Sequence, residues 1–361
     1  MHHSGKIFGY DKPGRYSIMK ILFIGGSGII STACAELAVE RGFDLTVLNR
    51  GLRASTPGAR QIVVDISDTD ASKKALGDTR WDVVVDFISF HPDDLKQRVE
   101  MFKDKVGQFV FISSASCYQK PAIDYLVTES TPLVNPFWPY SRDKIACEDY
   151  LMQELRENGF PVTIVRPSFT YGETVIPLSF NSWQHPYTVI DRMRKGLPVI
   201  IPGDGSSLWQ LTHNADFAKG LVGLLGHQNS IGHSFHITSD EVLNWNQIYQ
   251  ATAEAAGVSH VNAVHIASDF IVACLPDELG GLHGDKASSM VLDNSKIKRF
   301  VPDYVATHRY RDGIKRSISW YDSEPARQTI DEVANATYDK LIAAYQECLV
   351  SAQNAFSTSP T

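Results

Sequence analysis

The chain has 361 residues, of which 43% are hydrophobic, and it carries a formal net charge of −7. A chain of this length and composition can bury a large core in one large domain or two interlocked ones. The acidic balance argues against a nucleic-acid-binding surface, which usually needs clustered Lys and Arg. The sequence contains no run of about 18 apolar residues, so no membrane span is predicted.

The five cysteines are odd in number, scattered and without a Cys-x-x-Cys pair. They are typical of free thiols in a reducing compartment, so we expect a cytoplasmic protein. Residues 1–18 are polar and irregular and resemble a leader, with Met19 as the expected natural start. A signal peptide from Met19 to Ala35 is the alternative, but a strand, a glycine turn and a helix account for the same residues better.

From Met19 onward, strand and helix patterns alternate. Apolar runs without clean alternation indicate parallel strands that are buried on both faces. The expected strands are 21–24, 44–48, 61–64, 82–87, 108–113 and 162–166, and the expected helices between them are 29–41, 92–102 and 140–157. Residues 19–171 are therefore predicted to form an α/β domain with a doubly wound parallel sheet.

After Gly172 the pattern loosens, and Pro, Trp and His become frequent. Helices are expected at 187–195, 216–225 and 245–256, and residues 233–238 are expected to return a strand to the sheet. We assign 172–322 to a smaller, mostly C-terminal lobe. Residues 323–351 are predicted as an amphipathic C-terminal helix, starting near Glu324, and 352–361 as a tail.

A glycine-rich turn, residues 25–31, follows the first expected strand and precedes the first expected helix. Glycines let backbone N–H groups approach a pyrophosphate at a helix N-terminus, where the helix dipole favours anions. Ser31 occupies the position at which dinucleotide-binding turns usually have a third glycine. The turn predicts dinucleotide binding by Gly25, Gly28, Ile29 and Ile30.

The ends of the second and third strands bear on which dinucleotide binds. An acidic residue at the end of the second strand would select NAD, but this chain has Asn49 followed by Arg50. Arg50 could pair with a 2′-phosphate, so the sequence leans toward NADP over NAD, although a solvated loop arginine is the alternative. Asp65 and Ile66 are expected to contact the adenine, with an ordinary strand-end Asp as the competing interpretation.

Tyr140 and Lys144 lie one helical turn apart at the start of a predicted helix, so they share a face. An ammonium group beside a phenol stabilises phenolate and is expected to lower the Tyr140 pKa toward the working pH. The pair would serve proton transfer to or from a carbinol or carbonyl. Alone the motif is weak, because many helices contain it by chance.

Three further signals accompany this pair: a strand end 113–118 (Ser-Ser-Ala-Ser-Cys-Tyr), an Arg-Pro-x-x-x-Tyr-Gly segment at 166–172, and Pro-Gly-Asp-Gly at 202–205 leading to Asp216. With the glycine turn and Tyr-x-x-x-Lys, these ordered signals resemble the extended short-chain dehydrogenase/reductase family, the NAD-dependent epimerase/dehydratase group. The resemblance covers residues 19–321 and implies a Rossmann-type fold with a substrate-binding C-terminal lobe.

The resemblance also implies roles for individual residues. Ser114 would hold the substrate oxygen, Tyr140 would pass the proton, and Lys144 would bind the nicotinamide ribose. Ser113 and Ser116 are competing hydroxyls, the first assigned to the cofactor and the second to the substrate. Further positions follow from the same alignment: Arg166 and Pro167 beside the nicotinamide, and Tyr171 at the opening of the substrate region.

Two departures from the family pattern limit which reaction and which substrate are expected. Dehydratases of the family have an acidic pair directly after the catalytic hydroxyl, where this chain has Ala115 and Ser116. Water elimination would therefore need an acid from elsewhere, with Asp86 or Glu173 nearest in the sequence. An Arg for a nucleotide diphosphate is usual after Gly-Asp-Gly, but Trp209 is present, which suggests stacking on a sugar face or packing at a domain interface.

The histidines of the chain show no metal-binding spacing, so no metal is predicted. His185 lies in the expected substrate loop and is a candidate ligand contact. We expect an NAD(P)-dependent oxidoreductase or epimerase that acts on a secondary alcohol or ketone of a sugar or sugar nucleotide. The expected partner is this small molecule, with no nucleic acid and no membrane, and a homodimer is left open. The alternative is a non-catalytic nucleotide-binding or RNA-associated protein on the same fold.

Overall fold

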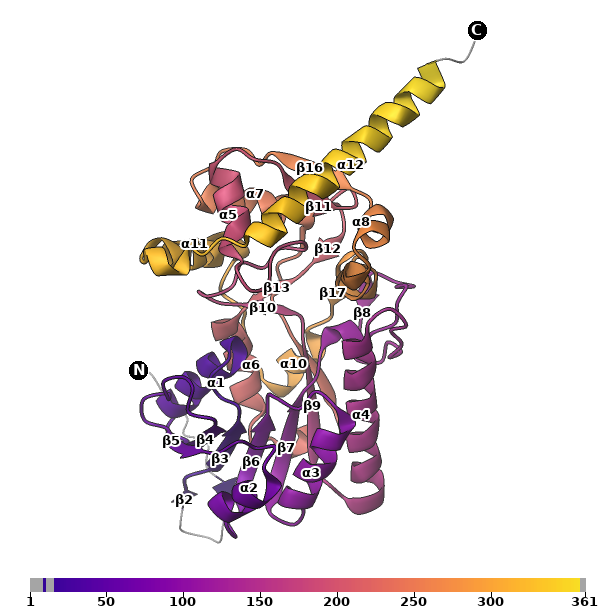
Figure 1. The fold of residues 1–361 in the computed structure, drawn as a ribbon. Coiled ribbons are helices and arrows are strands. Elements are labelled where there is room, and N and C mark those ends of the chain that lie inside the picture. The colour runs from indigo at the N-terminus through magenta and orange to yellow at the C-terminus, as the bar shows by residue number, and fades with distance from the viewer. Residues whose placement is uncertain (1–8, 11–15, 358–361) are drawn as a thin grey trace.

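A seven-stranded parallel sheet forms the centre of the protein in the computed structural model, which describes residues 9–10 and 16–357 (Figure 1). The spatial order is β14-β9-β7-β6-β3-β4-β5, so the winding direction reverses at β3. This confirms the predicted doubly wound sheet, in which ligands bind at the carboxyl ends of the strands beside the reversal. The strands are β3 (Lys20–Ile24), β4 (Asp44–Asn49), β5 (Arg60–Val63), β6 (Trp81–Asp86), β7 (Val106–Ile112), β9 (Val162–Pro167) and β14 (Ser234–Ile237).

Helices cover both faces of this sheet, which is why the strands read as continuous apolar runs. Along β3, Ile21 and Phe23 pack in one buried cluster with residues of α1 (Ile29–Glu40) and α6 (Asn214–Leu224). Leu22 and Ile24 point to the opposite cluster. That second cluster also contains residues of α2 (Thr69–Leu76), α3 (Pro92–Phe102) and α4 (Pro139–Asn158).

The first half of the chain follows the predicted order of strands and helices, with ends that differ by one or two residues. Helix α2 was not predicted, because its eight residues are mostly polar. Its start is fixed locally by Asp68, whose carboxylate accepts a hydrogen bond from the Ala71 amide at 3.0 Å. The predicted returning strand is confirmed as β14, which pairs with β9 in parallel register.

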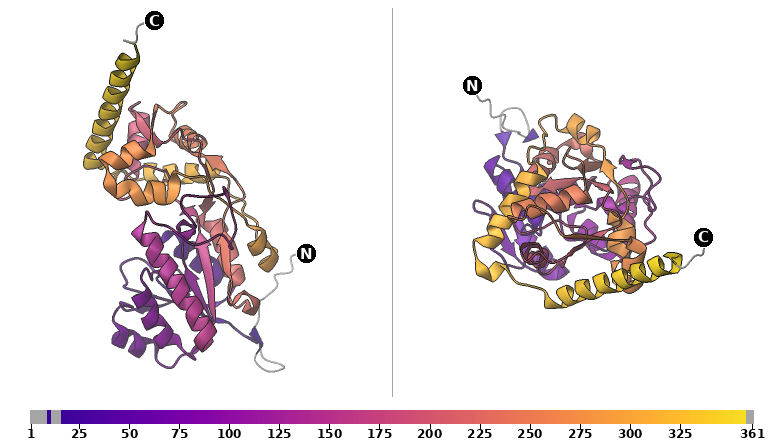
Figure 2. Two further views of the ribbon diagram at one scale, coloured as in Figure 1. Left: turned by 90° about the vertical axis from the view of Figure 1, so that its right-hand side faces the viewer. Right: turned by 90° about the horizontal axis from the view of Figure 1, so that it is seen from above.

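The second lobe lies over the carboxyl ends of the strands (Figures 1 and 2). Its core joins aromatic and aliphatic residues from many short segments. In contrast, Phe217 of α6 and Ile297 pack with the sheet, so helical segments return to the first domain as well as strand β14. The remaining elements are β8 (Leu126–Val127), β10 (Phe169–Tyr171), α5 (Tyr187–Arg194), β11 (Val199–Pro202), β12 (Leu208–Trp209), β13 (Leu211–His213), β15 (Leu243–Asn244), α7 (Trp245–Ala255), β16 (Ala263–Ile266), α8 (Ser268–Cys274), α9 (Leu279–Gly281), β17 (Val291–Leu292), α10 (Ser295–Phe300), α11 (Tyr310–Asp322) and short β1 (Gly9–Tyr10) and β2 (Tyr16–Ser17).

The C-terminal helix α12 spans Glu332–Ser357 and extends away from the body of the molecule (Figures 1 and 2). The predicted start near Glu324 was wrong: Pro325 begins only a 3₁₀ turn, and α12 starts where the Asp331 carboxylate accepts the Ala334 amide at 2.9 Å. Residues 352–357 continue the helix rather than forming a tail. Most of the predicted leader, and residues 358–361, lie outside the described residues. Within the described part of the chain, no helix has the length and apolarity to cross a bilayer.

Candidate active site

The glycine turn between β3 and α1 brings bare backbone to a helix N-terminus. Gly25 and Gly26 have φ values of 109° and 82°, and a Cβ on Gly26 would lie 2.4 Å from the Val47 side chain. Ser31, in place of a third glycine, is buried and accepts a hydrogen bond from the Gly28 amide at 2.8 Å. The first turn of α1 contains no acidic side chain, so its positive end is free to attract an anion.

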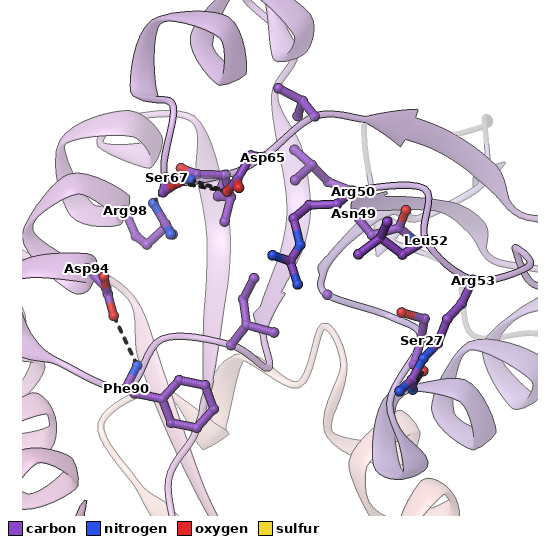
Figure 3. Close-up of a pocket in the computed structure, with 15 residues that line it drawn as sticks. Ser27, Asn49, Arg50, Leu52, Arg53, Asp65, Ser67, Phe90, Asp94 and Arg98 are labelled. Carbon is purple, nitrogen blue, oxygen red and sulfur yellow. Dashed lines mark hydrogen bonds between the residues drawn. The ribbon is translucent and has the colours of Figure 1, made fainter.

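A cleft of about 490 Å³ lies beside this turn (Figure 3). It brings together five of the residues that were predicted to hold the cofactor: Gly25, Asn49, Arg50, Asp65 and Ile66. The predicted contacts Gly28, Ile29 and Ile30 are not part of its lining. Strand order explains the grouping, because β3, β4 and β5 are neighbours and their carboxyl ends meet at one edge of the sheet.

Polar and charged groups in this cleft are held to different degrees. Asn49 is fixed, since its side-chain oxygen accepts hydrogen bonds from Gly51 at 2.8 Å and Gln61 at 2.9 Å. The Arg50 guanidinium points into the cleft (Figure 3) and is exposed. The amide and hydroxyl of Ser67 donate to Asp65 and lower the pKa of that carboxyl group, which stays anionic.

Two further arginines line the cleft and were not predicted. Arg53 donates to the Ser27 carbonyl at 2.7 Å, which ties the loop after β4 to the glycine turn. Arg98 comes from α3, is buried, and donates to the Ile66 carbonyl at 3.2 Å. Arg53 could have been found from its place three residues after Arg50. No sequence signal marks Arg98, because its position depends on how α3 packs.

A second cleft, of about 280 Å³, contains the predicted catalytic hydroxyls Ser114 and Tyr140. Ser114 follows β7, and Tyr140 lies in the first turn of α4. Phe90 links the two clefts: it lines the first, and its ring centroid lies 6.3 Å from that of Tyr140. The hydroxyls therefore face a space next to the predicted cofactor cleft.

A chain of hydroxyl groups extends from Ser114 into the protein. The Oγ atoms of Ser114 and Ser116 are 2.8 Å apart, and the Ser141 hydroxyl donates to Ser116 at 2.8 Å. The Ser116 amide also donates to Ser114 Oγ at 3.1 Å. These contacts fix the rotamer of Ser114, and they show that the two competing hydroxyls belong to one network.

The pKa of Tyr140 is raised, not lowered toward neutral pH as the pairing with Lys144 predicted. Burial raises the pKa of Tyr140 to about 12, and hydrogen bonding with Ser114 offsets only part of that effect. The buried Lys144 ammonium donates to the carbonyls of Ser89 at 2.8 Å and Ile112 at 2.9 Å. Lys144 thus ties the loop after β6 to the end of β7, and burial lowers its own pKa.

The Ser113 and Arg166 side chains line neither of these clefts, so their contacts with the cofactor stay a prediction. Ser113 donates to Glu148 at 2.5 Å, and Arg166 donates to the same carboxylate at 2.5–3.2 Å and to the Tyr118 hydroxyl at 2.9 Å. All four side chains are buried in an internal network. Pro167, in contrast, lines the second cleft.

Of the predicted substrate contacts, Ser116 and Trp209 line the second cleft. Trp209 also packs on Trp245, with ring centroids 5.4 Å apart. Tyr171 is fully buried against His213 and Tyr310, so its substrate role is not supported. His185 lines neither cleft.

The second cleft also contains residues that sequence reasoning missed. The exposed Trp183, two residues before His185, lines it, as do Trp138, Phe169, Asp285 and Lys286. Trp138 could have been suspected because it directly precedes α4. Asp285 and Lys286 carry no local signal. Asp86, considered earlier as an acid, is buried and accepts hydrogen bonds from Ile88 and Ser89.

No group of three or more His, Cys, Asp or Glu side chains in the described ranges 9–10 and 16–357 could hold a metal ion. The second cleft presents the hydroxyls of Ser114, Ser116 and Tyr140 and the charged groups of Asp285 and Lys286. A Ser hydroxyl and a Tyr hydroxyl that both reach one substrate oxygen are suited to transferring a proton to or from a carbinol.

The sequence matches known proteins at the level of a family. The model for the NAD dependent epimerase/dehydratase family matches residues 21–238. The chain is 24% identical to UDP-glucose 4-epimerase of Lactobacillus helveticus, over 85% of this chain and 98% of that protein. It is 27% identical to the chloroplast stem-loop binding protein of 41 kDa b of Arabidopsis thaliana, over 68% of this chain and 65% of that protein.

The fold matches solved structures. The structure of UDP-glucuronic acid 4-epimerase from Bacillus cereus, in complex with UDP-glucuronic acid and NAD, superposes with a TM-score of 0.66 at 20% identity. The match covers 84% of this chain and 99% of that chain. At this identity the likeness concerns the fold alone.

Proposed function

The chain belongs to the NAD dependent epimerase/dehydratase family, and we propose that it acts on a secondary alcohol or ketone of a sugar or sugar nucleotide with a nicotinamide dinucleotide as cofactor. The observation that carries this proposal is the meeting of Ser114 and Tyr140 in one cleft. That cleft lies at the carboxyl end of the sheet, and Phe90 joins it to the cleft beside the glycine turn.

The residues of the first cleft fit a dinucleotide. A side chain at Gly26 would meet Val47, so bare backbone is needed there, and the N-terminus of α1 lacks acidic side chains. We propose that Gly25, Gly28, Ile29 and Ile30 hold the pyrophosphate, and that Asn49, Arg50, Asp65 and Ile66 hold the adenosine end. Arg50, with Arg53 beside it, supports a lean toward NADP over NAD, because both cations could approach a 2′-phosphate.

In the proposed mechanism the bound nicotinamide supplies the hydride acceptor or donor. Ser114 orients the substrate oxygen, and its own hydroxyl is held by the bonds to Ser116. Tyr140 gives a proton to that oxygen in reduction and takes it in oxidation. With a pKa near 12, Tyr140 is protonated at neutral pH, so the structure favours the proton-donating role.

Tyr140→Phe tests the assignment. Absorbance would measure cofactor reduction or oxidation in the presence of a panel of free sugars and UDP-sugars. Calorimetry would measure cofactor affinity. We expect turnover to fall by at least about 10²-fold while cofactor binding is retained. Tyr125→Phe is the matched control, because Tyr125 is exposed and lines neither cleft. Near-normal turnover in the Tyr140 variant would contradict the mechanism.

The reaction type is tested in deuterated water. Because Ala115 and Ser116 stand where dehydratases have acids, we propose oxidation, reduction or epimerisation rather than water elimination. Epimerisation by direct hydride return leaves carbon-bound hydrogen unexchanged, whereas dehydration loses one water and gains solvent deuterium. Finding the mass loss would mean that another acid acts, and Asp285, the carboxylate in the lining of the second cleft, would be the first to mutate.

The match to a stem-loop binding protein favours one alternative, a nucleotide-binding or RNA-associated protein on this fold. The test is fluorescence anisotropy with a stem-loop RNA over a range of salt concentrations. RNA binding through phosphate contacts would weaken steeply with salt. Salt-dependent RNA binding together with no turnover on any sugar would favour this alternative.

A further inference from the structure

A rigid turn presents two charged side chains to the catalytic cleft. Residues 282–286 form a π-helical turn, a geometry that occurs frequently at functional sites. Its last three carbonyl oxygens each accept a hydrogen bond from a buried side chain of a distant segment. The donors are Asn135 to Gly284 at 2.7 Å, Lys120 to Asp285 at 3.1 Å and Trp245 to Lys286 at 3.1 Å.

Asn135 connects this turn to the catalytic hydroxyls. Its amide group donates both to the Gly284 carbonyl and to the Ser116 carbonyl, each at 2.7 Å. The turn and the Ser114–Ser116 segment therefore share one anchor. Asp285 and Lys286 are consequently held in a fixed place relative to Ser114 rather than carried on a free loop.

The Lys286 side chain is only 5% exposed, and its ammonium group is surrounded by aromatic rings. The nitrogen lies 5.9, 5.3 and 5.4 Å from the ring centroids of Trp138, Phe169 and Trp183, respectively. All three rings line the same cleft as Tyr140. Ring faces attract a cation but do not accept strong hydrogen bonds.

The ammonium group is under-satisfied. It has three N–H donors, and within the described part of the chain one hydrogen bond is made, to Asp285 at 3.0 Å. Glu278 also interacts with Lys286 electrostatically, but burial raises the pKa of that carboxyl group and no hydrogen bond joins the two. Burying an ammonium group with some of its N–H donors unpaired is costly, so an anionic ligand that reached the remaining donors would bind favourably.

We propose that Lys286 is the anion-binding residue of the catalytic cleft and that the substrate carries a carboxylate or phosphate group. The proposal rests on the proposed function above. In a cleft of about 280 Å³, an anion at Lys286 and a hydroxyl at Tyr140 belong to the same small molecule. The three aromatic rings around Lys286 offer faces for stacking the apolar side of a sugar ring.

The test measures binding without turnover. Protein saturated with its preferred cofactor would be titrated with glucose, glucuronate and glucose 1-phosphate, and tryptophan fluorescence would report binding because Trp138 and Trp183 line the cleft. We expect at least one of the two anions to bind about 10- to 100-fold more tightly than glucose. Comparing the anions distinguishes a carboxylate from a phosphate as the recognised group.

Lys286→Met keeps the apolar stem in the aromatic surroundings and removes the charge. We expect it to abolish the preference for the anion while leaving glucose affinity within about threefold. Lys298→Met is the matched control: it removes one charge from a half-exposed residue that lines neither cleft and pairs with Asp240, and it should keep the preference. Thermal unfolding would confirm that both variants are folded.

Equal binding of all three probes by the wild type would overturn the proposal, and this comparison needs no variant. An equal loss of glucose and anion affinity in Lys286→Met would also overturn it, because Lys286 would then only support the shape of the cleft. Competition by sulfate against the anion but not against glucose would support it. Failure of the proposed function is separate: it would appear as an absence of turnover with the anion preference intact.

Discussion

Replacing Arg166 with Met is expected to destabilise the protein because it leaves the Glu148 carboxylate buried without its partner. The two side chains are 6% and 3% exposed, and Arg166 donates to Glu148 through Nε at 2.9 and 3.2 Å and through Nη2 at 2.5 Å. Met retains the apolar stem, so the lost interaction is the charge and its hydrogen bonds.

Removing one partner of a buried ion pair costs about 3–5 kcal/mol in general. Here Ser113 remains as a donor to Glu148 at 2.5 Å, so we expect a loss of about 3 kcal/mol in the free energy of unfolding. Adding Glu148→Leu removes the stranded charge. The double variant should therefore regain about 1–3 kcal/mol relative to Arg166→Met alone.

Urea unfolding followed by circular dichroism would measure these free energies. Arg60→Met is the control: it breaks an ion pair with Asp44 in which the Arg60 side chain is 66% exposed, and such surface pairs are worth at most about 1 kcal/mol. Cofactor affinity, measured where Arg166→Met is still folded, should stay within about threefold of the wild type. A small stability loss combined with a large loss of cofactor affinity would refute the internal role of Arg166.

Three further outcomes are expected. Because burial raises the pKa of Tyr140 to about 12, the ultraviolet difference between wild type and Tyr140→Phe should show no phenolate up to about pH 10 in ligand-free protein; ionisation near neutral pH would contradict this. Arg50→Ala should weaken NADP more than NAD in calorimetric titration, and equal losses would make Arg50 an ordinary surface residue. Lys144→Met leaves the Ser89 and Ile112 carbonyls without their donor and should lower the free energy of unfolding by about 1–3 kcal/mol per buried carbonyl in urea melts, whereas an unchanged midpoint would show that water replaces it.

Much of the fold could be read from local patterns. The apolar runs at β3, β6 and β7 are continuous because both faces of the sheet are covered, and such runs identify buried parallel strands without any knowledge of the tertiary structure. The short helix α2 was missed, because its sequence is mostly polar and its start is set by the Asp68 cap.

The residues of the candidate site divide in the same way. Gly26 and Ser114 follow strands and Tyr140 begins a helix, so chain order alone places all three at the carboxyl edge of the sheet. Chain order does not determine the direction in which a side chain points. Arg166 and Tyr171 belong to motifs that suggested ligand contacts, yet the first turns to Glu148 and the second into the core.

The sequence by itself determined the parallel sheet and the glycine turn, since these depend on backbone periodicity and short-range spacing, whereas Ser114 was assigned through the family resemblance. Only the tertiary structure decided which charges face the cleft. Asp285 and Lys286 follow Ser114 by about 170 residues in the chain, and they reach it through the anchors Asn135, Lys120 and Trp245. Burial and hydrogen-bond partners at such separations arise from packing, which no local pattern encodes.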